Sequence, residues 1–142
     1  MYKRIFCPID GSEPSLHCMR EAIRLAKDQK AELCFFHIVD NSTLIMYMPI
    51  VESVFETMRQ EGRNILESAV AAARAQDVQA EQKILEIMTG RAGPLIVEEA
   101  EKYGADLIAI GTHGRRGISR LLMGSDAAAV IGASKVPVLL VK

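Results

Sequence analysis

A basic, glycine-rich segment near the C-terminus of the 142-residue chain carries residue types that bind phosphate. It runs from Gly111 to Ser125 and includes Arg115, Arg116 and Arg120. Glycines let the backbone approach a ligand closely, free N–H groups at a helix N-terminus point toward an anion, and arginines supply positive charge. Because an apolar run precedes the segment and a helical pattern follows it, the sequence predicts a phosphate-binding loop between a strand and a helix, and hence a nucleotide site.

Two familiar phosphate motifs do not fit this segment. No Gly-Lys-Ser/Thr follows four spacer residues, and the dinucleotide fingerprint belongs after a first strand. The glycines alone would equally suit a flexible strand-to-helix loop, so the arginines and the helix start at Gly124-Ser125 carry the prediction. One helix terminus contributes only about 0.3–1 kcal/mol, whereas micromolar binding needs roughly 8 kcal/mol. Several amides and a base pocket must therefore act together.

A second group of candidate residues lies in the N-terminal part of the chain. Asp10 ends the first apolar run and could hydrogen-bond a ribose hydroxyl or hold a divalent cation; the plainer interpretation is a turn or helix-capping residue. Pro8 and Val39 could line an adenine slot or simply pack within strands. His113 could contact phosphate or face solvent.

Apolar runs and helical spacings alternate along the chain. The expected strands are 5–9, 33–39, 78–88, 107–110 and 136–141. The first expected helix has Ser12 or Ser15 as its cap and Pro14 in its first turn, and the others cover 51–73, open at Gly93-Pro94 and cover 125–133. This alternation predicts an α/β fold, an open, doubly wound, five-stranded parallel sheet with helices on both faces, which is Rossmann-like. The length predicts a single domain, 1–142.

The polarity of the strands predicts their places in the sheet. The third strand is the most polar and should lie at an edge, whereas the first and fourth are apolar and should be central. If these two flank the point where the strand order reverses, Asp10 and the loop from Gly111 to Gly114 lie on either side of one crevice. The final strand, Val136 to Val141, should form the other edge and invite a homodimer.

Composition excludes several classes of partner. A net charge of −1, 5% aromatic residues and no Trp argue against nucleic acid, and no apolar stretch is long enough to span a membrane. The three cysteines lack the spacing of a metal site and are expected to be buried, reduced thiols. Reduced thiols and the expected absence of a signal peptide both indicate a cytoplasmic protein. Glu98, Glu99 and Glu101 are expected on a solvated helix face.

Over its full length the chain resembles the universal stress protein family. The resemblance is carried by Asp10-Gly11-Ser12, by residues 90–94 and 104–108, and above all by the spacing of Gly111, Gly114, Gly124 and Ser125, which matches the family's ATP-binding signature G-x2-G-x9-G-S. It implies a cytoplasmic, adenine-nucleotide-binding regulatory module of the stress response, often with a divalent metal such as Mg²⁺ or Mn²⁺, and a dimer through the final strand.

Motif and resemblance together predict the site. The predicted nucleotide-binding residues are Pro8, Asp10, Val39, Gly111, Thr112, His113, Gly114, Arg115, Gly124, Ser125 and Asp126, with Asp10 as the candidate metal ligand. Asp126 departs from the small or aliphatic residue usual in the family. Its charge could repel a γ-phosphate, which leaves ATP, ADP and AMP open as ligands.

Three other functions fit the residues less well. A slow ATPase or phosphotransferase ranks lower because no clear general base or nucleophile is present. A nucleotide-independent interaction scaffold conflicts with the intact glycine motif. A phospho-receiver domain would need an Asp after strand three, where the chain has Ile87-Met88-Thr89. No residue pattern identifies the stress, the pathway or a client protein.

Overall fold

The computed structural model describes residues 1–42, 52–113 and 123–142 of the chain. Strands and helices alternate strictly within them, as expected. The elements are β1 Arg4–Pro8, α1 Glu13–Gln29, β2 Glu32–Asp40, α2 Glu52–Arg74, β3 Ala80–Ile87, α3 Ala92–Tyr103, β4 Leu107–Gly111, α4 Ser125–Ala133 and β5 Val138–Val141. The third and fifth strands are shorter than the expected 78–88 and 136–141.

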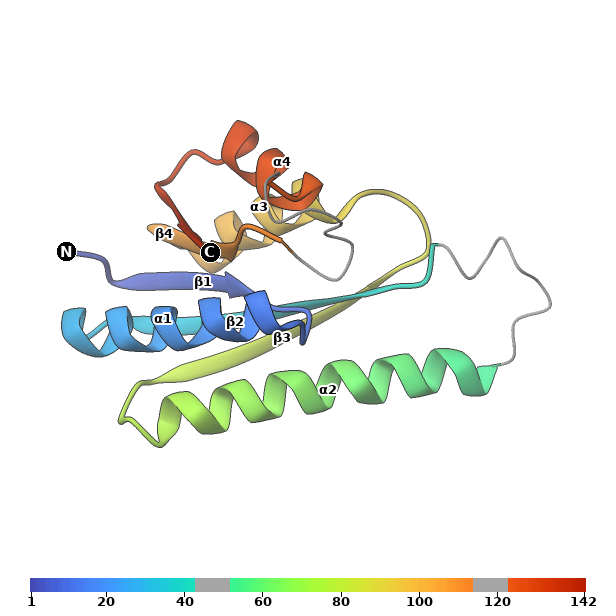
Figure 1. The fold of residues 1–142 in the computed structure, drawn as a ribbon, viewed down its shortest axis with the longest axis horizontal. Coiled ribbons are helices and arrows are strands. Elements are labelled where there is room, and N and C mark those ends of the chain that lie inside the picture. The colour runs from blue at the N-terminus through green and yellow to red at the C-terminus, as the bar shows by residue number, and fades with distance from the viewer. Residues whose placement is uncertain (43–51, 114–122) are drawn as a thin grey trace.

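The five strands form one parallel sheet in the order β3-β2-β1-β4-β5. Helices α1 and α2 pack on one face, and α3 and α4 pack on the other (Figure 1). The doubly wound α/β fold is therefore confirmed. The polar β3 lies at an edge and β1 lies at the centre, and the strand order reverses between β1 and β4.

Side-chain alternation along the strands builds a hydrophobic core on each face. In β1, Ile5 and Cys7 join the core under α1 and α2, whereas Phe6 joins the core under α3 and α4. Burial on both faces explains why the central strands are apolar throughout. All three cysteines are buried free thiols, as predicted, and burial raises the pKa of Cys34 to about 12.

Local signals set the ends of the helices. The Ser15 backbone N–H donates to the Ser12 side chain (3.4 Å), which caps α1. Gly104 ends α3 at a φ of 77°, in the left-handed region that favours glycine. Among the described residues, no helix is both long and apolar enough to cross a membrane.

The structure corrects the prediction for Glu99. Glu98 and Glu101 are exposed, but the Glu99 side chain is only 3% exposed and pairs with Lys83 of β3 and with Lys102 (3.0 Å). Burial alone would raise the pKa of Glu99, but hydrogen bonds from the two ammonium groups lower it below its ordinary value of 4.5. The ion pair with Lys83 ties α3 to the edge strand.

Gly62 lies in the middle of α2, where a glycine weakens a helix by about 1 kcal/mol relative to Ala. A Cβ at this position would lie 2.7 Å from His37 Cδ2 and 3.0 Å from Ile84 Cδ1. The glycine therefore lets α2 pack closely against β2 and β3.

Candidate functional site

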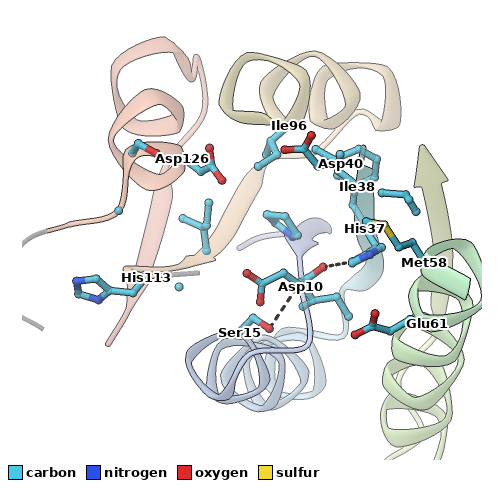
Figure 2. Close-up of a pocket in the computed structure, with 18 residues that line it drawn as sticks. Asp10, Ser15, His37, Ile38, Asp40, Met58, Glu61, Ile96, His113 and Asp126 are labelled. Carbon is cyan, nitrogen blue, oxygen red and sulfur yellow. Dashed lines mark hydrogen bonds between the residues drawn. The ribbon is translucent and has the colours of Figure 1, made fainter. Parts of the chain in front are cut away.

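A pocket of about 270 Å³ opens where the strand order reverses, at the carboxyl ends of β1, β2 and β4 (Figure 2). It gathers nearly all the described residues that the sequence nominated: Pro8, Asp10, Val39, Gly111, His113, Gly124, Ser125 and Asp126. Gly114 and Arg115 lie outside the described residues, as do Arg116 and Arg120. The structure thus brings the two predicted halves of the crevice together, and their role in binding stays a prediction.

Thr112 is the described candidate that does not line the pocket. Its backbone N–H donates to the Val141 carbonyl (3.0 Å), and its own carbonyl accepts from the Gly124 N–H (2.6 Å). Its Oγ1 lies 3.0 Å from Nδ1 of His113. Thr112 therefore joins β4, β5 and the start of α4.

Asp10 both shapes a turn and lines the pocket. Its Oδ1 accepts a hydrogen bond from the Ser12 N–H (2.9 Å), and Ser15 Oγ accepts from the N–H groups of Asp10 (3.2 Å) and Gly11 (3.1 Å). The turn interpretation is therefore correct. Because the same residue lies in the pocket wall, the turn also fixes where its carboxylate stands (Figure 2).

The first turn of α4 forms the opposite wall. Gly124 is the N-cap and makes no side-chain capping bond, and Ser125 and Asp126 line the pocket. The backbone N–H groups of a first helical turn have no intrahelical acceptors, and the helix dipole is positive there. This end of the pocket is therefore suited to an anion.

Apart from Val39, the wall that comes from β2, α2 and α3 was not predicted from the sequence. Figure 2 shows Met58 and Glu61 of α2 across the pocket from His113, with His37, Ile38 and Asp40 of β2 beside them. Asp40 ends β2, much as Asp10 follows β1. Because ligands bind beyond the carboxyl ends of the strands in such sheets, the sequence could have predicted Asp40 as a site residue as well. The sequence did not identify Met58 and Glu61 as pocket residues. Helical spacing shows which face of a helix points inward, but not whether that face lies against a core or a pocket.

His37 holds two pocket strands together. Its ring is buried, and Nδ1 lies 2.8 Å from the carbonyl oxygen of Ile9, which can only accept. Nδ1 therefore carries a proton and donates to Ile9 beside Asp10 (Figure 2).

The pocket has an apolar side, which also carries the carboxylates of Asp40 and Glu61. Ile38, Val39, Met58 and Ile96 give one side an apolar lining that suits a base, while the α4 terminus lies on the other. The described lining carries four carboxylates, at Asp10, Asp40, Glu61 and Asp126, and no Lys or Arg.

The described donor set does not fit a metal ion held by the protein alone. Among these residues, no group of three His, Cys, Asp or Glu side chains is placed to hold one. Mg²⁺ and Mn²⁺ prefer several oxygen ligands, and Asp10 supplies one carboxylate. The role of Asp10 as a metal ligand therefore stays a prediction.

Known proteins similar to this chain belong to one family. Residues 1–142 match the model of the "Universal stress protein family". The chain is 38% identical to universal stress protein MJ0531 of Methanocaldococcus jannaschii, over 100% of this chain and 83% of that protein. It is 32% identical to universal stress protein YxiE of Bacillus subtilis, over 100% of both chains.

Solved structures agree in fold. The structure of MJ0577 from M. jannaschii matches with a TM-score of 0.86 at 26% identity, covering 100% of this chain and 96% of that chain. A universal stress protein solved in complex with cAMP matches with a TM-score of 0.70 at 26% identity, covering 99% and 96%.

Proposed function

The chain belongs to the universal stress protein family, and we propose that it is a cytoplasmic module that binds an adenine nucleotide in the stress response. One observation carries the proposal. Residues from the end of β1 and from the start of α4, far apart in the sequence, line one pocket at the reversal point of the sheet. Open α/β sheets bind their ligands at this place. The cAMP complex of a structurally similar family member supports an adenine nucleotide as the ligand class.

The pocket suggests how a nucleotide would lie. The base would occupy the apolar side between Ile38, Met58 and Ile96. The ribose would then pass Asp10, whose carboxylate can accept a hydroxyl hydrogen bond. The phosphates would reach the N-terminus of α4, which has no side-chain capping bond, and the glycine-rich segment that precedes it in the sequence. We propose ATP as the principal ligand, with ADP and AMP as alternatives, and pairing of two copies through β5.

Calorimetry with ATP, ADP and AMP tests the proposal, together with mass spectrometry of any ligand that the purified protein carries. We expect at least one adenine nucleotide to bind with micromolar or tighter affinity. Gly114→Val should abolish binding, because a branched side chain would block close approach of phosphate to the backbone. Gly117→Val is the matched control, since Gly117 belongs to the same glycine-rich segment of the sequence but lies outside the spaced motif.

The experiments test separately whether an adenine nucleotide binds and whether its phosphates contact the glycine-rich segment. A folded wild-type protein that binds no adenine nucleotide would overturn the proposed function. Undiminished affinity in a folded Gly114→Val protein would show that the phosphates lie elsewhere.

A further inference from the structure

A hydrogen-bonded ion pair joins α2 to the edge of the sheet beside the pocket. Arg59 of α2 donates from Nε to Glu86 Oε2 (2.7 Å) and from Nη2 to Glu86 Oε1 (3.0 Å). Asn41, which follows β2, donates from Nδ2 to the same Oε1 (2.7 Å). These three residues form what we call the Arg59 network. It connects α2, β3 and the end of β2.

Each member of the Arg59 network is adjacent to a residue that lines the pocket. Glu86 is the β3 partner of Val39 in the strand register, and Asn41 follows Asp40. Arg59 follows Met58 on α2. Val39, Asp40 and Met58 line the pocket, whereas none of the three network residues does. The network therefore lies behind the wall that would receive the base.

Among the described residues, the first half of α2 is anchored by little buried surface, and the other bonds of Arg59, to Glu52 (2.8 Å) and Glu56 (3.3 Å), stay within this helix. The buried residues of this helix are Gly62, Leu66, Ala69, Val70 and Ala73. The turns from Glu52 to Glu61, which carry both α2 residues of the pocket wall, bury no side chain fully. A bidentate arginine–carboxylate pair fixes orientation as well as distance, and charge-assisted bonds are about twice as strong as neutral ones.

The partial burial of its residues favours a rigid Arg59 network. Asn41 is fully buried, and the side chains of Arg59 and Glu86 are only 27% and 28% exposed. Such partial shielding weakens screening by water and salt. Arg63, one turn further along α2, offers a contrast, since its bonds within the described residues reach only Glu56 and Gln60 of its own helix.

We propose that Arg59 and Glu86 are positioning residues that hold the α2 wall of the pocket against β2, and so set nucleotide affinity and base selectivity without touching the ligand. The inference rests on the proposed function. It adds a determinant that lies outside both the glycine motif and the pocket lining.

The test compares Arg59→Gln with Arg63→Gln, because both remove one positive charge from the same helix. Arg59→Gln should weaken ATP binding roughly tenfold, the size of one lost charge-assisted hydrogen bond. UTP affinity should fall less, so the preference for ATP over UTP should shrink. Arg63→Gln should change either affinity by less than about twofold, as expected for a pair on a helix surface.

Two further variants and one spectrum distinguish positioning from general loss of stability. Glu86→Gln removes the charge with little change of shape and should reproduce the effect, while Arg59→Lys keeps one charged donor and should restore part of the affinity. The methyl carbon resonance of Met58 should shift when ATP is added to wild type, and shift less in Arg59→Gln. Thermal unfolding confirms that each variant is folded.

The results separate this inference from the function on which it rests. Equal ATP affinity and equal base preference in the Arg59→Gln and Arg63→Gln proteins would overturn the positioning role while leaving the nucleotide site intact. Equal losses for ATP and UTP would also overturn it, because they would indicate a general loss of structure. A wild-type protein that binds neither nucleotide would overturn the proposed function, and this inference with it.

Discussion

Asp126 places a carboxylate in the first turn of α4, on the pocket wall where the phosphates are proposed to lie. At about 4 Å, like unit charges repel by roughly 1 kcal/mol in water and about 4 kcal/mol at an effective dielectric of 20. The cost should lie near the lower value because Asp126 is exposed. Asp126→Asn removes the charge and keeps the shape, so it should strengthen ATP binding more than AMP binding.

Calorimetry of both nucleotides at low salt and without metal measures this difference, which should shrink as salt rises. If wild type and variant show the same preference between ATP and AMP, Asp126 serves only to favour the helix start through its dipole.

Glu99 should contribute to stability in a pH-dependent way. Glu99→Gln should lower the free energy of unfolding at pH 7 by about 1–3 kcal/mol, because a buried carboxylate with two ammonium partners is lost. The pKa of Glu99 is lowered in the folded protein, so its contribution is complete above the ordinary value of 4.5 and is lost as pH falls through the folded pKa. The gap between variant and wild type should therefore close in acid.

Urea unfolding from pH 7 to pH 3 measures the gap. Glu98→Gln is the control, and its effect should stay within about 0.5 kcal/mol because Glu98 is exposed. A gap for Glu99→Gln that is unchanged at pH 3 would assign the loss to packing rather than to charge.

Glu99 also shows where sequence reasoning stops at the residue scale. It has the same polarity as Glu98 and Glu101, and the helical pattern alone did not separate them. What distinguishes it is Lys83, a residue of another element that only the folded sheet brings close. Asp10 and Gly124 could be predicted because a turn and a helix start are recognised from neighbouring residues. A partner on another element, such as Lys83, cannot be recognised from the residues near Glu99 in the sequence.

At the scale of elements, two glycines in helices should respond oppositely to alanine. Gly62→Ala should destabilise the protein by about 1–3 kcal/mol, because the new Cβ would lie 2.7 Å from the ring of His37, which is itself held by Ile9. Gly132→Ala in α4 should stabilise it by up to about 1 kcal/mol, since among the described residues no atom outside its chain neighbours and the nearby backbone of its own helix lies within 4 Å of the added Cβ. Thermal and denaturant unfolding measure both changes. A stabilising Gly62→Ala would mean that α2 can move away from β2 at little cost.

Strand polarity predicted part of the arrangement of the elements. The polar pattern of β3 indicated its edge position, and the apolar runs of β1 and β4 indicated central positions. That β1 and β4 flank the reversal point was a condition of the predicted crevice, and the structure shows it. The contribution of α2 to the pocket could not be predicted in this way. It depends on close packing at Gly62 and on the Arg59–Glu86 pair, both of which involve partners on other elements.

At the scale of the whole molecule, the site is a product of chain topology. The chain winds outward from β1 to β3 and then returns to the other side of β1, so β1 and β4 become neighbours although most of the chain separates them. This reversal brings the Asp10 turn and the start of α4 to one pocket. Neither segment could form the site alone, because each provides only one wall.

The opposite edge of the sheet leads to the last prediction, that two copies of the chain pair through β5. Among the described strands, β5 pairs with β4 alone, and its Leu139 and Leu140 remain 36% and 37% exposed. Ile131 of α4 is exposed as well. Apolar edge strands tend to pair with another chain, and a two-fold axis would cover both copies at once. Light scattering at micromolar concentration should therefore give the mass of a dimer.

Leu140→Lys should shift the protein toward monomer, because the charge would have to be buried at the new interface. Met88→Lys, at an exposed residue just beyond the other edge strand, should leave the dimer unchanged. No residue of β5 lines the described pocket, so the monomeric variant should still bind nucleotide with an affinity close to that of wild type. Monomeric wild type at high micromolar concentration would rule out pairing through β5, whereas loss of nucleotide binding in a folded monomer would mean that the second copy helps to shape the site.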